Sequence, residues 1–284
     1  MNNSYISYHA NSHIKPRSKN TLLASLVTLL LTTYLPAQSV ASTSTDPEKK
    51  GLAIAQEVEH RDTGWHDAKA KMQMVLTNAE GEKSIREIRQ RLLEVEGDGD
   101  KGLTIFDAPR DIKGTGFLSY THAIDADEQW LFLPALTRVK RIASNNKSGP
   151  FIGSQFSYED ISSFEVARFS YTYLRDENVD GRPAFVLENK PNYKYSGYTR
   201  LITWIDQERY VPVKIAYYDR KNKLLKTQIF NDYRQYLNQY WRSHNQTMTN
   251  HINGKVTQLE WKDYQFNTGL GSKDFNRTVL KRLK

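Results

Sequence analysis

The sequence has 284 residues and carries 40 Lys and Arg against 32 Asp and Glu, a net charge of +8. This mild excess of basic residues and the complete absence of cysteine exclude a small disulfide-stabilised scaffold and argue against a nucleic-acid-binding protein. A chain of this length without disulfides has to rely on one large hydrophobic core.

The N-terminal residues have the features of an export signal. A basic segment at residues 15–19 precedes an apolar run from Thr21 to Leu35, which is too short to span a bilayer comfortably. The segment Ser39-Val40-Ala41 has the small-x-small pattern of a signal peptidase site. We therefore expect a signal peptide at residues 1–41 and a single domain at residues 42–284 in the periplasm. An uncleaved N-terminal anchor is the alternative.

The exported part begins with a helix and continues with strands. Asp46-Pro47 is a good helix start, and Leu52, Ala55 and Val58 form a narrow apolar stripe, so we expect an amphipathic helix from Asp46 to Asp62 that packs against a sheet. From Trp65 onwards the polar and apolar residues alternate with a period of two, which is typical of strands. The expected strands up to the middle of the chain cover 69–76, 84–95, 103–106, 112–120 and 130–133.

The central stretch, from Trp130 to Asp160, combines three features. A short apolar run ends at Pro134, a basic run follows with Arg138, Lys140 and Arg141, and a loop rich in Ser, Asn and Gly comes last. Such a loop normally lacks large apolar side chains, but this one contains Phe151, Ile152, Phe156 and Tyr158. It therefore either folds back over a core or lines a site for an apolar ligand.

The second half of the chain also reads as strands joined by short turns. One long aromatic strand is expected to run from Phe164 to Tyr173, and the basic tail from Asp274 to Lys284 is expected to pack along one edge. The remaining expected strands cover 184–188, 201–205, 211–218, 224–236, 240–250 and 255–266. A sheet of roughly ten to twelve antiparallel strands has to curl or close. The sequence thus predicts a mainly β domain, a curved sheet with a helix against it.

No catalytic pattern is present in the sequence. It lacks a Gly-x-Ser-x-Gly elbow, a His-Glu-x-x-His motif, a phosphate loop and a dinucleotide fingerprint, and its histidines have no metal-ligand spacing. The acidic pairs Asp127-Glu128 and Glu159-Asp160 could serve as acid and base, but we interpret them as turn residues and a helix start. The expectation is a protein that is not an enzyme and uses no metal or cofactor.

Two adjacent motifs carry a resemblance to a known family. The run from Glu128 to Ile142, EQWLFLPALTRVKRI, and the run from Phe151 to Asp160, FIGSQFSYED, resemble signatures of the LolA-like outer-membrane lipoprotein-sorting family. Residues 217–226 and 268–275 also match later blocks of that family. The resemblance covers roughly residues 54–283.

The resemblance implies a fold and a function. The fold is a strongly curved antiparallel sheet forming an incomplete barrel, similar to LolA and LolB, with a helix against its concave face. The implied function is a carrier that shelters the acyl chains of a lipid or lipoprotein between the inner and outer membranes, with transient membrane contact. Burial of each methylene contributes about 0.8 kcal/mol, so such a cavity needs no catalytic group.

The candidate site residues follow from the central stretch. The expected lining of the lipid cavity is Trp130, Phe132, Leu133, Phe151, Phe156 and Tyr158, for which ordinary core packing is the alternative. The expected contacts to a headgroup or partner are Arg138, Lys140 and Arg141, for which a solvated strand face is the alternative. A second possible function is a non-carrying adaptor that docks on a membrane transporter of the resistance-nodulation-division class, since family members are often encoded beside such transporters.

Overall fold

The computed structural model describes residues 46–283, and the predicted signal peptide and its cleavage site lie outside the described residues. No helix in the described range is long and apolar enough to cross a membrane. The described residues form one long helix, thirteen strands and a short C-terminal helix, with 3-10 turns between them. The elements are α1 (Pro47–Arg61), β1 (Asp67–Thr77), β2 (Lys83–Leu93), β3 (Lys101–Ala108), β4 (Gly116–Tyr120), β5 (Glu128–Leu133), β6 (Arg138–Ile142), β7 (Phe169–Val179), β8 (Arg182–Pro191), β9 (Tyr198–Asp206), β10 (Pro212–Asp219), β11 (Leu224–Tyr236), β12 (Tyr240–Asn250), β13 (Val256–Phe266) and α2 (Arg277–Leu280).

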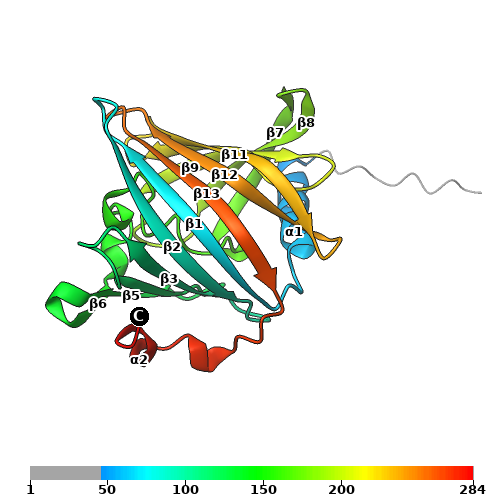
Figure 1. The fold of residues 1–284 in the computed structure, drawn as a ribbon. Helices are drawn as coiled ribbons and strands as arrows, with labels where there is room; N and C mark the ends of the chain where they lie inside the picture. The colour runs from blue at the N-terminus through cyan, green and yellow to red at the C-terminus, as the bar shows by residue number, and fades with distance from the viewer. Residues whose placement is uncertain (1–45, 284) are drawn as a thin grey trace, which may run out of the picture. The chain divides into compact units, whose positions relative to one another are not determined.

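The thirteen strands form one antiparallel sheet made of two meanders. Its order is β6-β5-β4-β3-β2-β1-β13-β12-β11-β10-β9-β8-β7, so the first and last strands of the chain pair in the middle. Met74 of β1 lies opposite Leu259 of β13 in this central pair. Among the described residues, no pairing joins the end strands β6 and β7, so the sheet curves strongly without closing (Figure 1). This confirms the predicted mainly β fold with an incomplete barrel.

Strand alternation divides the apolar residues between the two faces of the sheet. The largest cluster draws on β1 to β5 and also on β9 to β13, so it fills the concave side, where the two meanders face each other. A second cluster draws on Leu103, Ile105 and Leu118, which point to the opposite face. The tail covers this face with Phe275 and Leu280, which explains why β3 and β4 are buried on both sides.

Helix α1 lies against the β7 end of the sheet (Figure 1). Its N-cap is Asp46, whose Oδ1 accepts a hydrogen bond from the backbone N–H of Glu48 at 3.0 Å. Gly51 faces the sheet, and a Cβ on this residue would lie 2.8 Å from the backbone nitrogen of Tyr173, so only glycine permits this close approach. The helix is confirmed, but its buried face is shifted: Ile54 packs inwards, while Leu52 is exposed.

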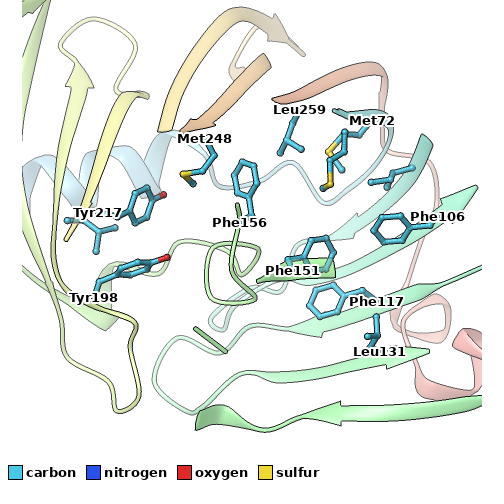
Figure 2. Packing of buried hydrophobic residues seen from close by; sticks show 13 residues of the cluster. Met72, Phe106, Phe117, Leu131, Phe151, Phe156, Tyr198, Tyr217, Met248 and Leu259 are labelled. Carbon is cyan, nitrogen blue, oxygen red and sulfur yellow. The ribbon is translucent and has the colours of Figure 1, made fainter. Parts of the chain in front are cut away.

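The connection between β6 and β7 crosses the concave side of the sheet. These two strands follow each other in sequence but stand at opposite ends of the sheet, so residues 143–168 have to span it. Phe151 and Phe156 of this connection are buried in the concave cluster, as Figure 2 shows. The connection also corrects one prediction, because the expected strand from Phe164 begins only at Phe169. A 3-10 turn at Val166–Arg168 precedes it.

Candidate functional site

Two cavities lie on the concave side of the described chain, and residues of α1 line both. The larger has a volume of about 1390 Å³ and the smaller about 980 Å³. They adjoin, since Val58, Trp65 and Phe230 line both. The larger volume exceeds the roughly 300–1,000 Å³ that is usual for small-molecule sites. A cavity of this size has room for a bulky or elongated ligand.

The larger cavity has an apolar wall built from three parts of the chain. Helix α1 forms one side, the end of the β6–β7 connection another, and the inward-facing residues of β7 to β11 the rest. Several of these side chains, among them Ala55, Val166 and Leu187, also pack against each other in a buried cluster between α1 and the sheet. The apolar wall consists of Leu52, Ala55, Val58, Phe164, Val166, Phe169, Leu187, Leu201, Ile205, Ile215 and Phe230.

A buried charged group also lines the larger cavity. Asp127 pairs with two cations at once: Lys147 Nζ lies 3.2 Å from its Oδ2, and Arg168 Nη1 donates to its Oδ1. The exposed fractions of these residues are 8% for Asp127, 5% for Lys147 and 6% for Arg168. We call them the Asp127 triad. The Tyr193 ring lies over both cations, 4.3 Å from Lys147 Nζ and 4.3 Å from Arg168 Cζ.

Two further carboxylates in this cavity are fully occupied by donors from the protein. Asp160 accepts from Lys226 Nζ at 2.5 Å and from the Tyr198 hydroxyl at 2.7 Å. Glu159 accepts from the Tyr193 hydroxyl at 2.5 Å and from the backbone N–H of Gly197 at 2.8 Å. These contacts anchor the β6–β7 connection to β9 and β11.

Carboxyl groups also gather where the two cavities meet. Burial, reinforced by the nearby charges of Glu94 and Asp62, raises the pKa of Asp100 to about 7. Burial likewise raises the pKa of Glu165 to about 7, and the neighbouring Asp100 and Glu59 add to the effect. Near neutral pH this part of the site therefore carries less negative charge than its composition suggests.

The structure does not bring the six expected lining residues together. Trp130 and Phe132 point to the convex side, where they pack with Phe275 and Leu280 of the tail. Leu133 and the three aromatic residues of the connection, Phe151, Phe156 and Tyr158, belong to the concave cluster instead. Among the described residues that line the two cavities, none is one of these six.

The three basic candidates lie on the edge strand β6. Arg138, Lys140 and Arg141 are exposed, and Arg141 Nη2 lies 3.3 Å from Glu128 Oε1. Lys and Arg on an unpaired edge also protect a sheet against pairing with another chain. In the described part of the chain, none of the three lines a cavity.

Comparisons with known proteins place this chain in a family. A family model described as that of an uncharacterized protein matches residues 98–282. A solved domain from Vibrio parahaemolyticus, described as an outer membrane lipoprotein-sorting protein domain, is 56% identical, covers 83% of this chain and 100% of its own, and superposes with a TM-score of 0.82. The chain belongs to the LolA-like family of outer membrane lipoprotein-sorting proteins. No curated protein matches it.

Two more distant structures support the fold of this LolA-like protein. A DUF1329 family protein from Desulfovibrio piger is 27% identical, covers 83% of this chain and 100% of its own, and has a TM-score of 0.79. A LolA superfamily protein from Nitrosomonas europaea is 18% identical, covers 81% of this chain and 98% of its own, and has a TM-score of 0.65, a likeness of fold alone. The resemblance inferred from the two central motifs is confirmed.

The residues that line the cavities of this LolA-like protein were not predictable as a set from the sequence. Asp127 and Asp160 were interpreted as turn or helix-start residues, yet both are buried in ion pairs. Their partners Lys147, Arg168 and Lys226 lie in separate parts of the chain, so no local spacing signals the pairs. The part of the site that the sequence did predict is α1, as an amphipathic helix that packs against a sheet.

We expect the stability of this LolA-like protein to fall as the pH rises through the pKa of Glu165. Its pKa is about 7 in the folded protein against an ordinary 4.5, so between these values the folded state binds more protons than the unfolded state. Stability therefore decreases with rising pH across that window. The Glu165→Gln variant cannot ionise, so its melting temperature should match wild type near pH 4.5 and exceed it by a few degrees at pH 8.

Thermal unfolding followed by circular dichroism across this pH range tests the expectation. The matched control is Glu80→Gln, in an exposed turn, which should follow the wild-type profile. A difference between Glu165→Gln and wild type that does not change with pH would contradict the assignment.

Proposed function

We propose that this protein is a periplasmic carrier that shelters the acyl chains of a lipid or lipoprotein during transfer between the inner and outer membranes. The observation that carries the proposal is the larger cavity, about 1390 Å³, between α1 and the concave face. Its apolar wall suits hydrocarbon, and burial of ten methylenes would contribute about 8 kcal/mol. The relative described as lipoprotein-sorting supports the same class of cargo.

The position of the cavity also favours carriage over catalysis. Entry beneath a single helix lets an acyl chain leave a membrane and stay covered, and the sheet stays open between β6 and β7 in the described chain. Transfer of this kind involves no bond making, so it requires no catalytic group. Phe151 and Phe156 belong to the cluster that fills the rest of the concave side, so the cargo is confined to the space beside α1.

Native mass spectrometry with lipid extraction, on mature protein purified from the periplasm, tests the proposal. We expect lipid or acylated peptide to co-purify at near one per chain. Val58 lines both cavities, so Val58→Trp should fill the space and sharply reduce the lipid-bound fraction. Ala53→Trp is the matched control, because it adds the same side chain to an exposed position of the same helix.

The contradicting result is equally clear. A wild-type protein that has the mass of the polypeptide alone, and keeps it after incubation with vesicles, is not a carrier. That outcome would favour the adaptor function, in which the protein docks on a membrane transporter.

A further inference from the structure

Two buried polar atoms in the larger cavity lack a hydrogen-bond partner. Within the described residues, Arg168 Nε and Asn189 Oδ1 have no partner, and both residues line this cavity. Their side chains are deeply buried, with exposed fractions of 6% and 2%. Buried polar groups in native proteins are almost always paired, because an unpaired one loses its hydration without compensation. An occupant of the cavity that carries polar atoms as well as hydrocarbon would pair with these two groups.

The charges around Arg168 indicate which polar group is missing. Lys147 and Arg168 share the single carboxylate Asp127. That carboxylate is saturated, because it also accepts from Ser162 Oγ at 3.2 Å and from the backbone N–H of His122 at 3.4 Å. The Asp127 triad thus has a formal net charge of +1, and Asp127 leaves Arg168 Nε without an acceptor.

Among the described residues, no carboxylate other than Asp127 lies within ion-pair distance of Lys147 or Arg168. Asp160 is paired with Lys226, and Glu159 has no cationic partner but accepts from neutral donors such as Tyr193. Apart from Glu165, the other carboxyl groups that line the cavity are Glu59, Asp62, Glu94, Glu96, Asp98 and Asp100. Glu165 is the carboxyl whose charge acts on Arg168, and burial raises its pKa to about 7, so at neutral pH it offsets only part of the excess charge. The unfilled role next to Arg168 is that of a hydrogen-bond acceptor for its Nε.

The donors suit a phosphate or carboxylate group. A guanidinium presents a planar set of N–H groups that matches such oxyanions, and an ammonium adds a mobile point charge. Tyr193 lies over both cations and restricts their movement. Asn189 adds an adaptable contact: its amide is hydrogen-bonded to Thr203 Oγ1 at 3.1 Å, and that hydroxyl can donate or accept, so either end of the amide can face the ligand.

We infer that the larger cavity binds an anionic phosphate or carboxylate headgroup at Lys147 and Arg168, with the acyl chains along the apolar wall beneath α1. This inference rests on the proposed carrier function and narrows its cargo to acidic amphiphiles. A zwitterionic choline headgroup would bring its own cation towards Lys147 and Arg168, so the site selects against it.

Uptake from vesicles of equal parts phosphatidylcholine and phosphatidylglycerol tests the inference, with bound lipid identified by native mass spectrometry. We expect wild type to prefer phosphatidylglycerol by a factor on the order of ten, typical of one charge-assisted hydrogen bond. The variants Arg168→Met and Lys147→Met, each checked for folding by circular dichroism, should still load lipid but lose the preference. Arg175→Met is the control, because Arg175 is exposed and pairs with Glu177.

The outcomes separate this inference from the carrier proposal. Lipid uptake by wild type without preference, or a preference that survives both variants, overturns the inference and leaves the carrier function standing. No uptake from these vesicles contradicts the carrier function. In that case, calorimetry with inorganic phosphate and glycerol phosphate decides: binding that Arg168→Met removes would assign the site to a free anion, and no binding would overturn the inference.

Discussion

Replacing Phe151 by alanine is expected to lower the free energy of unfolding by about 3–5 kcal/mol, the cost of deleting a fully buried aromatic side chain. Phe151 is 1% exposed and packs among Phe106, Phe117 and Tyr158, with ring centroids 6.1, 5.0 and 5.5 Å away. It holds the β6–β7 connection inside the curve of the sheet (Figure 2). Its loss would leave a void that this close-packed cluster cannot easily fill.

Urea unfolding followed by tryptophan fluorescence measures this effect. Ile124→Ala provides the control, because Ile124 is 86% exposed, and its truncation should change the stability by less than about 0.5 kcal/mol. A Phe151→Ala protein with nearly wild-type stability and reduced lipid uptake would instead favour the lining role expected from the sequence. The measurement thus shows whether Phe151 is a residue of the hydrophobic core or of the cavity wall.

The fold was largely predictable because its signals are local. The alternation through β1 and β2, the turn residues between them and the helix start at Asp46-Pro47 each mark one element. Strand count alone then requires curvature. The break at Val166–Arg168 was not predictable, because the aromatic residues on either side of it, Phe164 and Phe169, favour a strand locally. The buried ion pair of Arg168 and the backbone contact of Val166 with Glu59 of α1 hold the turn instead.

The site was less predictable than the fold, because a strand residue can line a cavity only if it lies on the concave face of the sheet. Trp130 and Phe132 alternate with Leu131 and Leu133 along one strand, and either pair could have faced the concave side. Nothing in the strand itself decides this. The tail decides it, since Phe275 and Leu280 cover the face that carries Trp130 and Phe132. Because the tail covers the convex side, this part of the sheet carries apolar residues on both faces, whereas the sequence predicted a single apolar lining.

The Asp127 triad could not be read from the sequence for a related reason. Its members come from the turn before β5, from the β6–β7 connection and from the turn before β7, and they meet only because the connection crosses the concave side. Lys147 sits in a loop rich in Ser and Asn, where a lysine is ordinarily exposed. A structure is needed to recognise it as a buried charge.

The triad leads to the second prediction with a large effect. Asp127→Asn should lower the free energy of unfolding by about 3–5 kcal/mol, because it leaves Lys147 and Arg168 buried without their counter-charge. Lys147→Met should cost much less. It leaves one carboxylate facing one guanidinium, and the methionine chain can occupy most of the space of the lysine stem. Urea unfolding of both variants at pH 7 measures the difference.

The double variant isolates the cause of that difference. If the cost of Asp127→Asn arises from repulsion and lost pairing of two buried cations, then adding Lys147→Met should recover about 0.5–3 kcal/mol, the range of coupling found for residues in contact. Strictly additive costs would show that Asp127 acts through its hydrogen bonds to Ser162 and His122 instead. Recovery would establish that Lys147 and Arg168 repel each other when Asp127 no longer compensates them. An anionic headgroup would act on the same two charges.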